Sequence, residues 1–221
     1  MSKIIVFGSG DIALLAKYYF ETDSDHTVEG FAVDREYLNS KNEFEGRPLV
    51  AFEDVTGIYP PAKYRMFIAL SYSKMNKFRQ QKYLEAKAKG YELVSYISSR
   101  CSYLSQSKPG DNCFILEGNA IQPFVKIGNN VTLWSGNHIG HHSVIDDHTF
   151  VSSHVVISGH CHVKPNCFLG VNSSIAHHVT VARETLIGAG VVLTKDSEEQ
   201  SVYVPARSAL LDKKSSDVQL R

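Results

Sequence analysis

The sequence predicts a small α/β domain with a parallel sheet over residues 1–100 and a left-handed parallel β-helix with a C-terminal tail over residues 101–221. Three observations predict this fold. Apolar strands alternate with helical stretches in the first hundred residues, a glycine-rich turn follows the first strand, and from residue 115 onward an aliphatic residue recurs at every sixth position. The alternation is typical of a parallel sheet covered by helices, whereas the six-residue period belongs to neither a helix nor an ordinary strand.

The first domain opens with a strand, a glycine turn and a helix. The expected strands are residues 3–7, 28–33, 67–71 and 93–97, the expected helices are residues 12–20 and 74–89, and residues 98–114 form the joint to the second domain. The turn reads Gly8-Ser9-Gly10-Asp11, and Asp34 ends the second strand. Such a turn brings backbone N–H groups to a phosphate, and the acid can accept from a ribose or base. This favours nucleotide binding, although the glycines could simply permit close strand-to-helix packing.

The six-residue period defines the second domain. A triangular coil with three six-residue sides would bury every aliphatic residue of the series, and a compact residue four positions later would also point inward. Cys161 and Cys167 occupy this compact position and are therefore expected to fill the core. Glycines that directly follow an aliphatic residue are expected at tight corners; they are Gly128, Gly140, Gly170 and Gly188. The aliphatic series is Ile115, Ile121, Ile127, Leu133, Ile139, Ile145, Val151, Ile157, Val163, Leu169, Ile175, Val181, Ile187 and Leu193.

Nine of the ten histidines lie between residues 138 and 178. Five of them share one position, three beyond the aliphatic residue, and should point outward: His142, His148, His154, His160 and His178. Because one turn of the coil takes eighteen residues, His142, His160 and His178 should form a column. For most of these side chains a surface or subunit-interface position is the simpler explanation. His141 is the candidate general base, since an amine must lose a proton to attack a thioester, and a backbone N–H near Gly159 could stabilise the oxyanion.

Composition excludes several function classes. The chain has 23 basic and 23 acidic residues without a basic cluster, which argues against nucleic acid or anionic membranes as partners. Neither a signal peptide nor a membrane span is apparent, so a cytoplasmic location is expected. The four cysteines form no Cys-x-x-Cys pair, so no zinc ribbon is expected.

Two segments of the coil carry a family resemblance: residues 138–145, His-Ile-Gly-His-His-Ser-Val-Ile, and residues 166–173, Asn-Cys-Phe-Leu-Gly-Val-Asn-Ser. With the opening Ile4-Ile5-Val6-Phe7-Gly8-Ser9-Gly10 and the terminal Val204-Pro205-Ala206-Arg207, the chain resembles the bacterial sugar acyltransferases with hexapeptide repeats. That family includes the sialic acid O-acetyltransferases and the N-acetyltransferase of the bacillosamine pathway.

The resemblance implies an acetyl-CoA-dependent acetyltransferase that works as a homotrimer, with the coenzyme in a groove between two coils and no metal. The implied substrate is a nucleotide-linked amino sugar, a 4-amino-4,6-dideoxyhexose, for surface polysaccharide, lipopolysaccharide or O-antigen assembly. His141 and His142 would be catalytic. The substrate would contact Gly8, Ser9, Gly10, Asp11, Asp34 and Ser71, and the coenzyme Phe150, Gly159, Gly170, Asn172, Ala189, Gly190 and Pro205.

Two departures from the family pattern concern this site. The bacillosamine enzyme has a glutamate after its catalytic histidine, whereas this chain has His142. Asp146 or Asp147 is therefore expected to orient His141. The glycine that usually precedes the final Pro-Ala-Lys/Arg is also absent, which bears on the adenine end of the coenzyme.

Alternative functions remain open at this point. O-acetylation of a sugar of the sialic acid type would use the same base and coenzyme groove. A zinc hydratase of the γ-carbonic anhydrase type is also built on a trimeric β-helix, but its usual His-x4-His pair does not occur here. A scaffold that only presents the first domain, or a nicotinamide oxidoreductase, would not bind acetyl-CoA.

Overall fold

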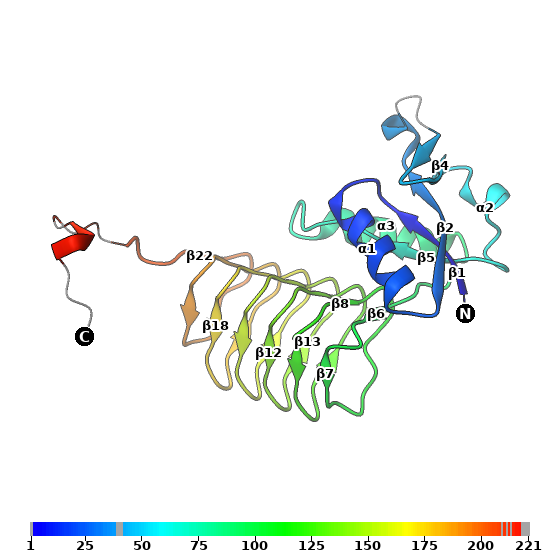
Figure 1. Cartoon of the computed structure of the whole chain (residues 1–221). Coiled ribbons are helices and arrows are strands. Elements are labelled where there is room, and N and C mark those ends of the chain that lie inside the picture. Colours follow the sequence, from blue (N-terminus) through cyan, green and yellow to red (C-terminus); the bar gives the residue numbers. More distant parts are fainter. Residues whose placement is uncertain (1, 39–41, 209, 211, 213, 218–221) are drawn as a thin grey trace.

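The computed structural model describes residues 2–38, 42–208, 210, 212 and 214–217. A small α/β domain sits at one end of a long parallel coil, and the described residues that follow the coil extend from its other end (Figure 1). This is the predicted combination of an N-terminal α/β domain and a C-terminal left-handed β-helix.

The α/β domain is built on a five-stranded sheet in the order β3-β4-β2-β1-β5. Strands β1, β2, β4 and β5 are parallel, and β3 is an antiparallel edge strand. Helix α1 covers the predicted residues 12–20, and its Ala13, Ala16 and Phe20 are buried. The bounds are β1 Ser2–Phe7, α1 Asp11–Thr22, β2 His26–Val33, η1 Arg35–Tyr37, β3 Glu43–Phe44, β4 Arg47–Ala51, α2 Val55–Ile58, β5 Arg65–Ile68 and α3 Lys77–Ala88.

Residues 93–97 do not form the expected fourth strand of this sheet. Leu93 makes a single parallel bridge to Met66, after which β6 (Tyr96–Ile97) pairs with β8 (Phe114–Ile115) of the coil. Strand β7 (Ser102–Tyr103) also pairs within the coil, so the expected joint already belongs to it. The boundary at residue 100 remains a prediction, although coil pairing begins at β6.

The coil has three parallel sheets that form the faces of a triangular prism. Face I contains β6, β8, β11 Thr132–Leu133, β14 Phe150–Val151, β17 Phe168–Leu169, β20 Leu186–Ile187 and β22 Val202–Tyr203. Face II contains β7, β9 Ala120–Ile121, β12 His138–Ile139, β15 Val156–Ile157, β18 Ser174–Ile175 and β21 Val192–Leu193. Face III contains β10 Lys126–Ile127, β13 Val144–Ile145, β16 His162–Val163 and β19 Thr180–Val181.

The predicted interior of the coil is confirmed. Every aliphatic residue of the six-step series is buried, and so are Cys161 and Cys167. The residue three beyond every aliphatic residue of the series except Leu193 adopts the left-handed conformation, for example His142 at φ 61° and His160 at φ 58°. This position turns the chain from one face to the next, which is why Gly, Asn and His are frequent there. His148 differs from the expectation, because it is buried at 7% exposure.

The glycines that follow aliphatic residues lie where a side chain would not fit, as expected. The left-handed corner residue lies two positions later, so these glycines are not needed for their backbone conformation. They are needed because adjacent coils approach closely at these positions. A Cβ at Gly140 would lie 2.5 Å from the backbone nitrogen of Gly159, and one at Gly170 would lie 2.6 Å from that of Ala189. A larger residue would force the coils apart.

Helix α3 joins the α/β domain to the coil through a buried arginine. Arg79 is 2% exposed, and its guanidinium donates to the carbonyl oxygen of Asn130 at 2.6 Å and to that of His148 at 3.1 Å. It also donates to Thr132 Oγ1 at 3.0 Å. Burial lowers the pKa of Arg79 to about 10, so it remains a cation at neutral pH. The domain is therefore fixed against face I and the corner that precedes it.

The C-terminal segment first closes the coil and then leaves it. Strand β22 pairs with β20, and the described residues beyond it extend away from the prism, with a short η2 turn at Ser215–Asp217 (Figure 1). Among the described residues, no helix combines the length and apolar character needed to cross a membrane.

Candidate active site

The glycine turn between β1 and α1 has two glycines with different roles. Gly8 has φ 128°, and a Cβ there would lie 2.7 Å from the carbonyl oxygen of Ala69, so no other residue fits without displacing β5. Gly10 caps the N-terminus of α1 and has open space where a side chain would stand. The first helical turn, which begins at Asp11, has N–H groups without partners inside the helix. The turn is thus open to an anion.

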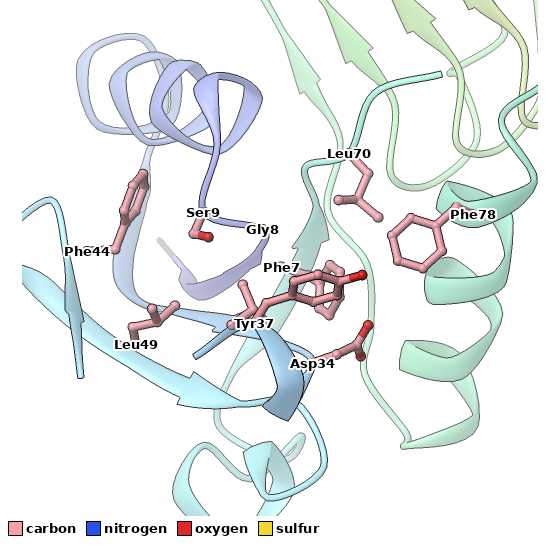
Figure 2. Close-up of a pocket in the computed structure, with 10 residues that line it drawn as sticks. Phe7, Gly8, Ser9, Asp34, Tyr37, Phe44, Leu49, Leu70 and Phe78 are labelled. Carbon is pink, nitrogen blue, oxygen red and sulfur yellow. The ribbon is translucent and has the colours of Figure 1, made fainter. Parts of the chain in front are cut away.

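A cavity of about 340 Å³ lies beside this turn at the carboxyl ends of β1 and β2 (Figure 2). The predicted residues Gly8, Ser9 and Asp34 line it. The apolar and aromatic part of the lining was not predicted from the sequence; it consists of Phe7, Val33, Tyr37, Phe44, Leu49, Leu70 and Phe78. Tyr37 and Phe78 come from separate segments, η1 and α3, so no sequence motif groups them. A flat aromatic ligand matches this lining.

Asp34 is held at the edge of the cavity by a buried cation. Lys82 Nζ donates to Asp34 Oδ1 and to Glu85 Oε2, both at 2.7 Å. Burial opposes the charge of Lys82, but these two hydrogen bonds outweigh it and raise its pKa. Because Lys82 uses one carboxylate oxygen of Asp34, the other remains available to accept from a ligand.

Two further hollows continue from the cavity to the coil. One of about 270 Å³ lies over the turn, where Gly10, Asp11 and the predicted Ser71 line it, and it shares Gly8, Ser9 and Leu70 with the first cavity. The other hollow, of about 240 Å³, lies against the coil and shares Ile12 with the hollow over the turn. Its remaining lining is Tyr72, Trp134, Phe150, Ser152, Ser153 and Val171. The three hollows adjoin one another in series from Asp34 to the corner between faces I and II, and this series is called the path below.

His141 lies on the corner between faces II and III. Its backbone N–H donates to Gln122 Oε1 at 2.8 Å, and its Nδ1 lies 3.0 Å from Nδ1 of His142. The expected carboxylates bind elsewhere: Asp146 pairs with His162 Nε2 at 2.8 Å, and Asp147 accepts from the backbone of Asn129 at 2.7 Å. His142 therefore replaces them as the side-chain partner of His141.

Gly159, one coil further on, gives His141 its space. A Cβ at Gly159 would lie 2.8 Å from Cε1 of His141 and 2.9 Å from Cε1 of His177. The His141 and His177 rings pack edge-on at a centroid distance of 6.0 Å. Both imidazoles thus lie above a glycine, and both are exposed.

The residues predicted to contact the coenzyme fall into three places. Gly170, Asn172, Ala189, Gly190 and Pro205 lie along the corner between faces I and II. Gly159 lies on the corner of His141. Phe150 is buried on face I, where its ring packs against Tyr72 at a centroid distance of 5.0 Å. A single chain does not bring all seven residues together.

The base and the path also lie on different sides of one coil. The α/β domain packs on face I, through Tyr72 on Phe150 and Arg79 on Thr132. In a three-sided prism, the corner between faces II and III is the one opposite face I. A molecule lying in the path of one chain therefore does not meet His141 of that same chain.

The repeats of the coil match a known family model. Residues 124–159 and 160–195 match the family model described as bacterial transferase hexapeptide (six repeats). Both matched segments lie within the coil.

Three solved structures share this fold along nearly the whole chain. The acetyltransferase domain of PglB from Neisseria gonorrhoeae FA1090 has a TM-score of 0.80 and 19% identity, covering 95% of this chain and 100% of that one. A mutant of perosamine N-acetyltransferase from Caulobacter crescentus, in complex with CoA and GDP-perosamine, has a TM-score of 0.80 and 20% identity, covering 94% and 96%. WeeI from Acinetobacter baumannii AYE has a TM-score of 0.77 and 19% identity, covering 93% and 97%.

Proposed function

We propose that this protein transfers the acetyl group of acetyl-CoA to the amino group of a nucleotide-linked amino sugar. The observation that carries the proposal is the series of adjoining hollows from Asp34 over the glycine turn to the coil. Its aromatic cavity suits a nucleobase, its helix N-terminus suits a diphosphate, and its end between Trp134 and Phe150 suits the apolar face of a hexose. The solved perosamine N-acetyltransferase binds a ligand of this kind, GDP-perosamine, together with CoA.

The active site is completed by a second copy of the chain, in a homotrimer. Within one chain the path ends at the corner between faces I and II, whereas His141 lies on the corner between faces II and III. If the corner between faces I and II of one copy packs beside the corner between faces II and III of its neighbour, the neighbour's copy of His141 meets the path of the first copy. The coenzyme then lies along this seam, against Gly170, Asn172, Ala189, Gly190 and Pro205 of one copy and Gly159 of the other.

His141 acts as the general base in this proposal. The sugar nitrogen forms a bond to the thioester carbonyl carbon while His141 takes a proton from that nitrogen. The carbon–sulfur bond then breaks, and coenzyme A leaves as the thiol after receiving a proton. His142, within hydrogen-bonding distance at Nδ1, orients the His141 ring and fixes its tautomer. The chemistry requires no metal.

A coupled thiol-release assay across a panel of nucleotide-sugars tests the proposal. The expected substrate is a 4-amino-4,6-dideoxyhexose linked to a nucleotide, of the kind used for surface polysaccharide such as the O-antigen of lipopolysaccharide, and the expected location is the cytoplasm. Activity confined to sugars without an amino group would overturn N-transfer in favour of O-acetylation. Failure to bind labelled acetyl-CoA would overturn transfer altogether.

A further inference from the structure

Five imidazoles gather on the corner between faces II and III, on three successive coils. The rings of His142, His160 and His178 are stacked, with centroid distances of 4.7 and 4.9 Å and interplanar angles of 11° and 18°. His141 and His177 pack edge-on beside this column, and the His141 ring lies 5.1 Å from that of His160. The acetyl-transfer proposal uses only His141 and its neighbour, which leaves the remaining imidazoles without a role.

Three of these side chains have the geometry of a metal site. His141, His142 and His160 each offer one ring nitrogen, and the three nitrogen atoms lie within 4.8 Å of one another. Around a tetrahedral zinc ion with Zn–N bonds of 2.0–2.1 Å, the ligand nitrogens are about 3.3 Å apart. The rings are exposed, so small rotations close the remaining gap.

The surroundings favour a transition metal over other ligands. The trio contains no carboxylate, so it matches Zn²⁺, Ni²⁺ or Cu²⁺ better than Ca²⁺ or Mg²⁺. The corner backbone is fixed because the N–H of His160 donates to the carbonyl oxygen of His141 at 2.9 Å. Gly159 adds no side chain that would fill the space.

We propose that His141, His142 and His160 bind one divalent transition-metal ion, with water as the fourth ligand, and that the bound ion inhibits the enzyme. The ion would not serve catalysis. A coordinated His141 has donated its lone pair to the metal and can no longer accept a proton from the substrate amine. The inhibitory half of this inference rests on the proposed function, whereas the binding half rests only on the three nitrogens.

Metal binding is tested on the full chain after removal of bound metal by a chelator. Titration with Co²⁺ should give the visible absorption of a tetrahedral nitrogen-ligated ion at one equivalent per chain, and Zn²⁺ should displace it. His160→Asn should weaken Co²⁺ binding at least about tenfold. The matched control is His154→Asn, since His154 has the same corner conformation, φ 59°, and is exposed on another corner; it should bind like the wild type.

Inhibition is tested by the thiol-release assay with Zn²⁺. Wild-type activity should fall as Zn²⁺ is added and recover with chelator, whereas His160→Asn should need at least about tenfold more Zn²⁺. Absence of Co²⁺ binding, or equal binding by His160→Asn and the wild type, would overturn the site. Binding without inhibition would overturn the blocking role. A metal-free chain that binds Co²⁺ but transfers no acetyl group would refute the proposed function and leave the site standing.

Discussion

Gly159 lies directly beneath His141, one coil further along the corner, and a Cβ at Gly159 would lie 2.8 Å from Cε1 and 2.9 Å from Nε2 of the imidazole. The position of the candidate base therefore depends on the absence of a side chain on the next coil.

Replacing Gly159 by Ala should displace His141 without unfolding the coil. Misplacing a catalytic group by about 1 Å can lower the rate about a hundredfold, so kcat should fall by this order. Gly57→Ala is the control, because nothing lies within 4 Å of a Cβ at Gly57. Steady-state kinetics and circular dichroism measure the two effects. Unchanged turnover in Gly159→Ala would contradict the claim that Gly159 sets the position of His141 for catalysis.

Asp34→Asn should weaken binding of the nucleotide-sugar more than it slows the chemistry. The substitution removes the charge that pairs with Lys82 at 2.7 Å and the carboxylate oxygen that faces the ligand. KM for the nucleotide-sugar should rise while KM for acetyl-CoA stays near the wild-type value. Asp54→Asn, which alters the exposed pair with Arg35, is the control and should change neither constant. An equal rise in both KM values would place Asp34 outside the nucleotide site.

Stability should fall at acidic pH because of His148. Asn130 Nδ2 donates to Nδ1 of His148 at 2.9 Å, so this nitrogen must be unprotonated, and burial lowers the pKa of His148 to about 4. The unfolded chain binds a proton near pH 6.5, so this contribution to stability is lost as pH falls from about 6.5 to about 4, by up to about 3 kcal/mol.

The corner position supplies a matched pair of variants for that test. His148→Asn and His154→Asn both place Asn at a left-handed corner, with φ 63° and 59° in the wild type, but only His148 is buried. Denaturant unfolding at pH 7 and pH 4.5 should show a smaller acid loss for His148→Asn than for His154→Asn. Equal acid losses would assign the pH dependence to other groups.

Arg79→Ala should destabilise the chain strongly. The substitution leaves a void and removes the donors for the carbonyl oxygens of Asn130 and His148, at a cost of about 2–5 kcal/mol. Arg35→Ala, which removes an exposed ion pair, should cost less than about 1 kcal/mol. Thermal unfolding compares the two. A similar small effect for both variants would mean that Arg79 does not fix α3 to the coil.

The sequence allowed prediction of the parts of the fold that repeat and of the parts that are local. The six-residue series identified the buried residues of the coil because each aliphatic residue occupies the same inward position on the next side of the prism. The turn Gly8-Ser9-Gly10 and Asp34 were found because both follow strands. Strand β6 was misassigned because its two residues look like the end of a buried strand, and its partner β8 lies eighteen residues away.

The rest of the site depends on contacts between distant segments. Tyr37 and Phe78 line the nucleotide cavity from η1 and α3, and neither belongs to a pattern. In the sequence, Lys82 is one of many charges on a predicted helix. Only the structure shows that α3 places it against Asp34. Counting six-residue sides places His141 and Phe150 on opposite sides of the prism. Only the packing of the α/β domain on face I shows that the path therefore lies away from His141 of the same chain.

Subunit complementation tests the shared active site most directly. His141→Asn should lose about two to four orders of magnitude in kcat while retaining coenzyme binding and the trimer. Gly10→Trp should be inactive because its side chain fills the hollow over the turn, where the wild type has open space. Co-assembly of the two inactive chains should restore activity, since about one site in four then combines an intact path with an intact His141 from the neighbour. Mixed trimers that remain as inactive as either parent would contradict a site shared between copies.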